Sequence, residues 1–379
     1  MRRSALLIAA SFFAFACQSG SQTEAATATS DKPFTTTVVA DLDEPWAMTF
    51  LPKSNQALIT EKKGKLLLWE SGGKVEEVGG VPKVAYGGQG GLGDVIIHPD
   101  FGNNGFVYLS FVEAGEGGKG AAVARGTLNT VKGKPMLTGV QVIWRQEPKV
   151  SGEGHFGHRL AFGPDGMLYI SSGERQKFTP AQDLNQNLGK IVRMTDGGMV
   201  PSDNPFYDQG RVKSQIWSYG HRNPLGIAFD AKGRLWNQEM GPQGGDELNL
   251  VKKAANYGYP KASNGRNYGS STDDIPDHKA GDGFEAPKVY WDPVISPSGL
   301  MIYSGNMFKS WKGSAFIGGL SSKALIRVKL DGENATKADQ WDMGARIREV
   351  EQGPDGAIWL LEDGKNGSQG RLLKLTPNK

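Results

Sequence analysis

The sequence predicts an all-β protein, and more narrowly a six-bladed β-propeller. Two observations lead to this prediction: one β-hairpin pattern recurs along the chain, and no long amphipathic helix interrupts it. The chain also has 53 glycines in 379 residues, and they fall at turns between apolar runs. Hairpin units spaced in this way are typical of radial repetition.

The repeated unit is an apolar strand, a turn, and a second apolar or aromatic strand. Two copies, residues 160–173 and 350–364, share the turn P-D-G, in which Pro fixes φ and Gly takes a positive φ. Looser copies occupy residues 47–61, 95–110, 227–239 and 301–318. Six units predict six blades. The alternatives are an irregular seven- or eight-bladed propeller and, less well supported, a sandwich, whose turns would come closer together.

Residues 1–17 predict an export signal. Arg2 and Arg3 form a basic start, and residues 5–16 are an apolar run that is short for a membrane span. We therefore expect an exported protein, either periplasmic or anchored to a membrane.

Cys17 is the single cysteine of the chain and directly follows the apolar run. This position is typical of a lipid-modified cysteine, although Ala14 stands where the lipoprotein pattern usually has leucine; ordinary cleavage nearby is the alternative. Residues 18–32 are rich in Ser, Thr, Ala and Gln and predict a flexible linker. The propeller domain is expected over residues 33–379.

Composition and motifs exclude several classes of function. A net charge of +3 with interspersed basic residues does not favour a nucleic-acid partner. A lone cysteine excludes intramolecular disulfides and paired-cysteine metal sites. The chain has no dinucleotide-binding fingerprint, no G-x-S-x-G elbow and no H-E-x-x-H motif.

The candidate functional residues are dispersed, as expected where loops from several blades meet at a channel mouth. His155 lies among glycines just before the third unit and is a candidate general base, or alternatively a structural histidine. Arg222 and Asn223 occupy the matching place before the fourth unit. Gln89 stands among five glycines in G-G-Q-G-G-L-G-D, which indicates either a close-approach loop or a flexible surface loop.

Arg346 and Arg348 lie just before the sixth unit, in A-R-I-R-E-V. Their spacing in a strand places both guanidinium groups on one face, where they repel each other unless an anion lies between them. The alternative is that each pairs with a nearby carboxylate on the surface.

A glycine-rich loop over residues 241–247 offers oxygen ligands for a hard cation. The carbonyls of Gly241 and Pro242 and the carboxylates of Asp246 or Glu247 suit calcium, although the loop is not an EF-hand. The Arg222–Asn223 loop precedes one predicted hairpin in the chain, and this loop follows it. Together they predict a polyanionic cofactor bound beside a metal ion.

The chain resembles the soluble aldose sugar dehydrogenases of the glucose/sorbosone dehydrogenase family, which use pyrroloquinoline quinone (PQQ). The matching segments run in order from residue 44 to residue 356. They are E-P-W-A-M-T-F-L-P, G-G-Q-G-G-L-G-D, G-H-F-G-H-R-L-A-F-G-P-D-G, A-Q-D-L-N-Q-N-L-G-K-I-V-R, D-N-P-F, W-S-Y-G-H-R-N-P-L-G, G-P-Q-G-G-D-E-L-N, N-Y-G-Y-P and R-I-R-E-V-E-Q-G-P-D-G.

The resemblance implies a six-bladed fold and a role for each matching position. His155 corresponds to the catalytic base, and Arg222 to the arginine beside the reacting carbonyl of the cofactor. The positions that correspond to PQQ-binding residues are Gln89, Asn223, Lys323, Arg346 and Arg348. Those that correspond to calcium-binding residues or lie near metal sites are Gly241, Pro242, Asp246, Glu247 and Tyr257. One departure is Gly154, where some relatives have an acidic residue; Glu153 lies one position earlier.

The activity implied is oxidation of an aldose at its anomeric carbon to an aldonolactone. His155 would remove the hydroxyl proton, hydride would pass to PQQ, and calcium with Arg222 would stabilise the developing charge. With no haem-attachment motif in the chain, the electrons must leave to an external acceptor. Two alternatives from other classes are a calcium-dependent propeller lactonase and a non-catalytic surface-binding propeller.

Overall fold

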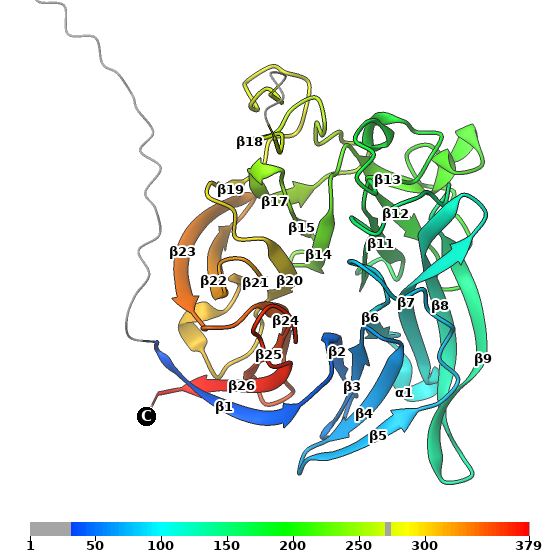
Figure 1. Ribbon diagram of the computed structural model, residues 1–379, viewed down its shortest axis with the longest axis vertical. Helices are drawn as coiled ribbons and strands as arrows, with labels where there is room; N and C mark the ends of the chain where they lie inside the picture. The colour runs from blue at the N-terminus through cyan, green and yellow to red at the C-terminus, as the bar shows by residue number, and fades with distance from the viewer. Residues whose placement is uncertain (1–31, 270–273, 379) are drawn as a thin grey trace, which may run out of the picture.

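The computed structural model describes residues 32–269 and 274–378. Within them the chain forms six four-stranded antiparallel sheets arranged in a ring, with a small two-stranded ribbon beside one sheet (Figure 1). The predictions of an all-β protein and of six blades are therefore confirmed. The export segment and Cys17 lie outside the described residues and stay predictions.

We number the blades in the order of their innermost strands. Blade 1 consists of β2 (Pro45–Phe50), β3 (Gln56–Glu61), β4 (Lys65–Glu70) and β5 (Lys74–Val78). Blade 2 consists of β6 (Leu92–Ile97), β7 (Phe106–Gly115), β8 (Gly118–Val131) and β9 (Lys134–Arg145). Blade 3 consists of β10 (Gly157–Phe162), β11 (Leu168–Ser172), β12 (Lys190–Met194) and β13 (Ile216–Tyr219).

The second half of the ring follows the same plan. Blade 4 consists of β14 (Pro224–Phe229), β15 (Leu235–Glu239), β17 (Asp246–Val251) and β19 (Val289–Trp291). Blade 5 consists of β20 (Pro297–Ile302), β21 (Ala315–Gly319), β22 (Ala324–Asp331) and β23 (Asn334–Asp342). Blade 6 consists of β24 (Ile347–Gln352), β25 (Ile358–Glu362), β26 (Arg371–Pro377) and β1 (Phe34–Asp41). The ribbon consists of β16 (Gln243–Gly244) and β18 (Gly265–Arg266).

Helix is almost absent from the described residues. The helical segments there are α1 (Phe101–Asn104) and the 3₁₀ turns η1 (Thr179–Gln182), η2 (Tyr207–Gln209), η3 (Lys213–Gln215) and η4 (Lys309–Trp311). In this part of the chain, no helix combines the length and hydropathy that a membrane crossing requires.

Each predicted hairpin unit is the inner pair of strands of one blade. Residues 160–173 contribute to β10 and β11, and residues 350–364 to β24 and β25. The glycines of the two P-D-G turns, Gly166 and Gly356, have φ of 74° and 82°, the positive values that the turn requires. The local turn chemistry was therefore a sound guide to the repeat.

The two ends of the described chain close the ring together. The N-terminal strand β1 pairs antiparallel with β26, from Phe34 opposite Pro377 to Asp41 opposite Arg371. Figure 1 shows these blue and red strands side by side as the outer part of blade 6. Blade 6 is thus built from both ends of the sequence.

The hydrophobic core lies between blades rather than in one central mass. Each pair of neighbouring blades encloses a cluster of buried apolar side chains. Between blades 5 and 6, for example, Phe34 packs edge-on against Trp341 with ring centroids 5.4 Å apart. Because inner strands have a neighbour on both faces, a strand such as β11 is buried along its whole length.

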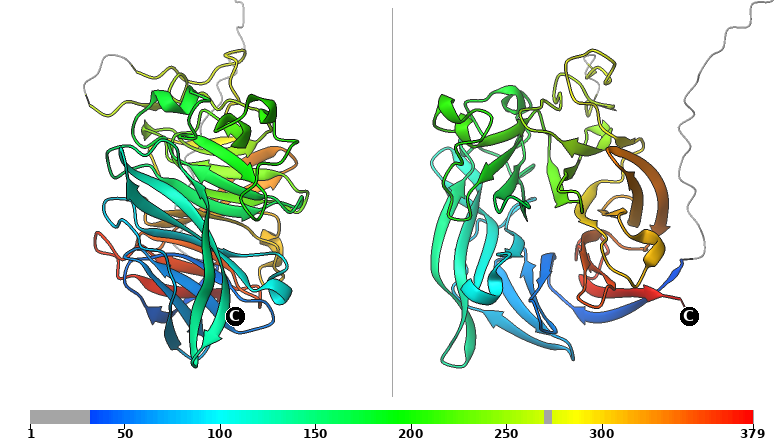
Figure 2. Two further views of the ribbon diagram at one scale, coloured as in Figure 1. Left: turned by 90° about the vertical axis from the view of Figure 1, so that its right-hand side faces the viewer. Right: turned by 180° about the vertical axis from the view of Figure 1, so that it is seen from behind.

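The inner strands share an irregularity near their first residues. The register between first and second strand shifts at this point in all six blades. Such bulges re-aim side chains and are common beside functional sites. In an antiparallel hairpin, the start of the first strand and the end of the second lie at the same end. The loops at that end form one face of the disc seen edge-on in Figure 2, and we call it the mouth.

Candidate active site at the mouth of the propeller

Two adjoining cavities of about 330 Å³ each open at the mouth. They share Gln89, Met240 and Ser296. The first, the cationic cavity, is lined by four cationic side chains and one carboxylate: Lys62, Arg346, Arg348, Lys365 and Asp363. The second, the histidine cavity, is lined by His155, Glu174, Arg222, Gly241 and Asp246, among others. Loops from all six blades contribute to this pair of cavities.

His155 is held between a carboxylate and an amide. Its Nδ1 contacts Glu174 Oε1, and its backbone N–H donates to Gln89 Oε1 at 2.7 Å. Because Glu174 accepts the Nδ1 proton, Nε2 of the neutral ring carries the lone pair and can act as a base. Burial and the charge of Arg222 lower the pKa of His155, although Glu174 opposes them. The side chain therefore favours the neutral, proton-accepting form.

Glu174 also orders the loop that follows it. Its Oε2 accepts the backbone N–H groups of Lys177 at 2.5 Å and Phe178 at 2.7 Å. Burial works to raise the pKa of Glu174, but the hydrogen bonds from His155 and Phe178 lower it. An ionised Glu174 thus orients His155 with one oxygen and holds the loop at Lys177 and Phe178 with the other.

Glu174 is a functional residue that we did not single out in the sequence. The sequence has Gly154 where some relatives have an acidic residue, which put a carboxylate partner for His155 in doubt; the nearby Glu153 pairs with Lys119 at the surface, 2.5 Å away. A repeat signal could have found Glu174. Four blades have an acidic residue at or just after the end of the second strand, and it accepts backbone N–H groups there: Glu61, Glu174, Glu239 and Glu362.

Arg222 brings a guanidinium group to the same cavity. Its Nη1 donates to the Met240 carbonyl at 3.0 Å, while its buried Nε has no hydrogen-bond partner among the described residues. Glu239 accepts the backbone N–H of Arg222 at 2.6 Å and so fixes the loop. A buried donor without an acceptor is costly. The Nε of Arg222 is therefore available as a donor at the wall of this cavity.

Asn223 and His221, the neighbours of Arg222, serve the scaffold. Asn223 Oδ1 accepts the Gly157 N–H at 3.2 Å, and Asn223 is not among the residues lining either cavity. His221 Nδ1 contacts Glu239 at 2.9 Å and its Nε2 contacts Ser218 Oγ at 2.9 Å. Both ring nitrogens of His221 are therefore engaged, which leaves none for chemistry.

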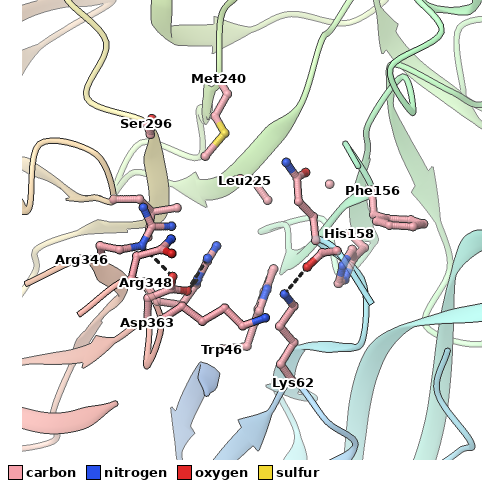
Figure 3. Close-up of a pocket in the computed structure, with 16 residues that line it drawn as sticks. Trp46, Lys62, Phe156, His158, Leu225, Met240, Ser296, Arg346, Arg348 and Asp363 are labelled. Atoms are coloured by element: carbon pink, nitrogen blue, oxygen red, sulfur yellow. Dashed lines mark hydrogen bonds and ion pairs between the residues drawn. The ribbon is translucent and has the colours of Figure 1, made fainter. Parts of the chain in front are cut away.

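Arg346 and Arg348 lie together on one wall of the cationic cavity (Figure 3). Asp363 bridges them, accepting from the Nε of each at 2.8 Å. Burial alone would raise the pKa of Asp363, but the two arginines lower it to about 2. The structure thus shows the alternative, in which the arginines pair with a carboxylate of the protein, although one buried carboxylate serves both. Because one carboxylate offsets one of two charges, this wall remains positive.

The cationic cavity contains two lysines that the sequence did not reveal and lacks one that it suggested. Lys62 and Lys365 line it, whereas Lys323 is exposed in the β21–β22 loop and is not among the lining residues. Lys62 and Lys365 were missed because they follow the second strand of a blade, whereas most of the sequence candidates lie just before a first strand. The assignment of Lys323 to cofactor binding stays a prediction.

The residues predicted to hold metal fall into two groups. Gly241 and Asp246 line the histidine cavity, beside Pro242. The Asp246 carboxylate accepts the N–H groups of Gly241 at 2.9 Å, Ile295 at 2.8 Å and Ser296 at 2.7 Å. Asp246 therefore shapes the loop, which leaves the backbone carbonyls of Gly241 and Pro242 as the candidate cation ligands of this group, although the Pro242 carbonyl also accepts the Tyr268 hydroxyl at 3.4 Å.

Glu247 and Tyr257 lie deeper in blade 4. Burial and the charge of Glu239 raise the pKa of Glu247. Asn249 Nδ2 contacts both carboxylates, at 3.1 Å to Glu239 and 3.3 Å to Glu247, while its Oδ1 has no partner among the described residues. The Tyr257 hydroxyl is occupied by the Leu250 carbonyl at 2.6 Å. Within the described ranges, no three acidic, histidine or cysteine side chains form a metal-binding group.

A third cavity of about 500 Å³ adjoins the histidine cavity. The two share Phe178, Arg222 and Tyr268. Phe178 and Tyr268 are largely exposed, and prolines form much of the remaining wall. Two partly exposed aromatic side chains and Arg222 therefore border both cavities.

Comparisons with known proteins agree with this geometry. The family model described as glucose/sorbosone dehydrogenase matches residues 42–374. Aldose sugar dehydrogenase YliI of Escherichia coli K12 is 42% identical over 343 residues, which cover 89% of this chain and 91% of that protein.

Two solved structures extend the comparison. The apo-form crystal structure of the soluble aldose sugar dehydrogenase from Escherichia coli has a TM-score of 0.85 and 40% identity, covering 91% of this chain and all of that one. The PQQ-bound aldose sugar dehydrogenase from Streptomyces coelicolor has a TM-score of 0.75 and 30% identity, covering 93% of this chain and all of that one.

Proposed function

The chain belongs to the glucose/sorbosone dehydrogenase family, and from that premise we propose that it is a PQQ-dependent dehydrogenase of aldose sugars. It would oxidise the anomeric carbon of the sugar to an aldonolactone and pass the electrons to an external acceptor. One observation supports this best: a buried His155–Glu174 pair and Arg222 line a cavity that adjoins a second cavity lined by four cationic side chains.

His155 would take the proton of the anomeric hydroxyl on Nε2. Glu174 keeps the ring in the required tautomer and stabilises the positive charge that the ring gains. Gln89 accepts the backbone N–H of His155 and so helps to hold the segment that carries the ring. Arg222 supplies a donor for the oxygen on which negative charge develops.

The side chains of the cationic cavity fit PQQ. PQQ has three carboxylates, and the cavity presents Lys62, Arg346, Arg348 and Lys365 against the single carboxylate of Asp363. Bound PQQ would supply the quinone that accepts the electrons released from the sugar. Gln89, shared by both cavities, lies where a bound cofactor and the reacting sugar would meet. Asn223 would support this site through the loop that it ties to Gly157.

Calcium is part of the proposal. The carbonyls of Gly241 and Pro242 would hold it at the histidine cavity, on the loop that Asp246 shapes. A second cation would suit Glu247, near Tyr257. There, two buried carboxylates lie close together, and the oxygens of Asn249 and Asn237 have no partner among the described residues. Such oxygen-rich, negatively charged pockets suit a hard cation.

The cationic lining also separates the dehydrogenase from the lactonase alternative. A propeller lactonase needs a metal surrounded by carboxylates and amides at the mouth. Here arginine and lysine side chains dominate one of the two cavities, which favours an anionic organic cofactor. We further propose that the protein is exported and that Cys17 is a lipid anchor. Residues 18–32 would form a flexible linker between this anchor and the propeller.

Reconstitution tests the function. Apoprotein would be loaded with PQQ and calcium and assayed on a panel of aldoses with an artificial electron acceptor. We expect dye reduction that requires both PQQ and calcium, with an aldonolactone as product. Absence of oxidation of every aldose by protein shown to contain PQQ would contradict the proposal.

A further inference from the structure

The cations of the cationic cavity differ in whether they have a carboxylate partner. Arg346 and Arg348 share Asp363, and Lys365 pairs with Glu44 at 3.0 Å. Lys62 forms no ion pair with any residue in the described ranges. Its one hydrogen bond there is from Nζ to the Gly88 carbonyl, at 2.6 Å. Lys62 is thus the cation of this cavity whose charge the described residues leave without a direct partner.

Lys62 is also buried, with 7% of its surface exposed. An ammonium group makes up to three hydrogen bonds, and burying it without a counterion is costly. A lysine kept in this state beside three other cations is explained if an anion completes its environment. The position suits this reading, because Lys62 follows β3 directly and its side chain rises toward the cavity opposite Arg346 and Arg348 (Figure 3).

We propose that Lys62 is a cofactor-binding residue that forms a salt bridge with a carboxylate of PQQ, across the cavity from Arg346 and Arg348. The inference rests on the proposed function. It explains why Lys62 has no carboxylate partner among the described residues, whereas Arg346, Arg348 and Lys365 each have one. It also provides the charge that was expected from Lys323, which is exposed and does not line the cavity.

The surroundings of Lys62 make the proposal testable by pH. Burial, then the charges of Arg348 and Lys365, lower the pKa of Lys62 to about 8, while Asp363 and Glu44 oppose them. The Tyr86 ring lies 5.8 Å from its Nζ. Of the other groups nearby, burial lowers the pKa of His158 to about 3, and the hydrogen bond from Lys119 lowers that of Glu153. Neither of these two changes charge between pH 7 and 9.

A bound carboxylate requires a protonated Lys62. The affinity of the wild-type protein for PQQ is therefore expected to fall as the pH rises from 7 to 9. In K62Q the amide can still donate to the Gly88 carbonyl, but no charge is lost with pH. The PQQ affinity of K62Q should be about 10- to 100-fold weaker at pH 7 and nearly independent of pH over this range.

The experiment is a titration of apoprotein with PQQ in the presence of calcium, followed by calorimetry and by tryptophan fluorescence, since Trp46 lines the cavity. K62R should keep most of the affinity. K63Q is the matched control, because Lys63 is exposed, pairs with Asp43 at 2.9 Å and does not line the cavity; its affinity should stay within about twofold of wild type. Thermal unfolding of each apoprotein checks the fold.

Two results would overturn the inference while leaving the proposed function intact. One is PQQ binding by K62Q that matches wild type at both pH values. The other is a K62Q affinity that falls between pH 7 and 9 as steeply as that of the wild type, because the pH dependence would then come from another group. Failure of the wild-type protein to bind PQQ at all would instead remove the proposed function and this inference with it.

Discussion

Two histidine–carboxylate pairs of the same construction lie in neighbouring blades, and one contact separates their roles. His155 pairs with Glu174, and His221 pairs with Glu239. The second ring nitrogen of His221 is occupied by Ser218, and the ring stacks on Tyr257 with centroids 4.6 Å apart. His155, in contrast, lines a cavity. Reactivity at this mouth therefore depends on which imidazole has a nitrogen left for a ligand.

Replacement of His155 tests the proposed base directly. H155A should lose about 10²- to 10⁴-fold in turnover, because the proton of the sugar hydroxyl loses its acceptor. PQQ affinity should change little, since the cationic cavity is lined by other residues. Steady-state kinetics on protein with a measured PQQ content would check both expectations. H221Q provides the comparison, because His221 lines neither cavity; this variant should lower the stability of the fold more than it lowers turnover. Wild-type turnover in PQQ-loaded H155A would remove His155 from this role.

Glu174 should control both the rate and its pH dependence. Burial lowers the pKa of His155 and Glu174 raises it, so the acid limb of kcat/KM should lie below the ordinary histidine value of about 6.5. E174Q removes the raising influence, which should move that limb to still lower pH. Turnover should also fall by about 10- to 100-fold, since the ring loses its orienting partner.

The matched control for Glu174 is E153Q. Glu153 is the exposed carboxylate of the loop before His155 and pairs with Lys119. Its replacement should leave the acid limb in place and turnover within about twofold. A pH–rate profile of E174Q that coincides with wild type would show that Glu174 does not act through His155.

At the scale of elements, the inner hairpin of each blade sets up the mouth. Every inner strand begins with a bulge, and four of the second strands end at or just before a glutamate that accepts backbone N–H groups. Bulge and glutamate together fix the loops that carry His155 and Arg222. The candidate functional residues thus lie on a bulge-and-glutamate arrangement that recurs in other blades, where it has a structural role.

The strand β1 provides a prediction at this scale. A chain that begins at residue 33 keeps β1 and should unfold at the wild-type temperature, whereas a chain that begins at residue 42 exposes the edge of β26. The shorter chain also loses Phe34, whose burial against Trp311 and Trp341 alone is worth about 3–5 kcal/mol. Calorimetry and light scattering would show a lower unfolding temperature and aggregation. Equal stability of the two chains would contradict a closing role for β1.

At the scale of the whole molecule, one buried side chain joins five blades. Arg159 of blade 3 donates to the Leu225 carbonyl at 2.8 Å, to Asp94 at 3.4 Å and to Glu349. It also donates to the Arg348 carbonyl at 3.3 Å and lies 3.9 Å from the Trp46 ring centroid. These partners belong to blades 4, 2, 6 and 1. Arg159 therefore ties the inner strands together directly beneath the cationic cavity.

Loss of Arg159 should destabilise the whole propeller. R159M leaves Asp94 and Glu349 buried without a cation, at an expected cost of about 3–5 kcal/mol in the free energy of unfolding. Burial already raises the pKa of Glu349 to about 7, and this pKa should rise further in the variant. Because the folded state then binds more protons than the unfolded state, stability falls as pH rises, so the defect should be larger at pH 8 than at pH 5.

Two further variants make this prediction specific. R159M/E349Q removes one uncompensated charge and should recover part of the stability. R145M is the surface control, because Arg145 pairs with Glu113 while half exposed, and it should cost less than about 1 kcal/mol. Denaturant unfolding of the apoproteins provides the values. A loss in R159M no greater than in R145M would contradict the bridging role.

The sequence by itself determined the repeat, the fold and the types of residue at the mouth. Turn chemistry is local, so P-D-G and its looser copies marked the six inner hairpins without knowledge of their packing. The same spacing placed His155 and Arg222 at matching ends of neighbouring units, and the structure brings them to one cavity. The shared face of Arg346 and Arg348 also followed from strand geometry alone.

Only the tertiary structure decided which side chains partner these residues. Glu174 faces His155 across 19 positions of the chain, Asp363 bridges two arginines at least 15 positions away, and Lys62 enters a cavity whose other walls come from distant blades. Asp246, expected as a metal ligand, accepts three backbone N–H groups and so organises its loop. The physical reason is that a periodic pattern reports which face of a strand is buried, whereas contacts across a ring of blades depend on closure of the ring, which no local segment encodes.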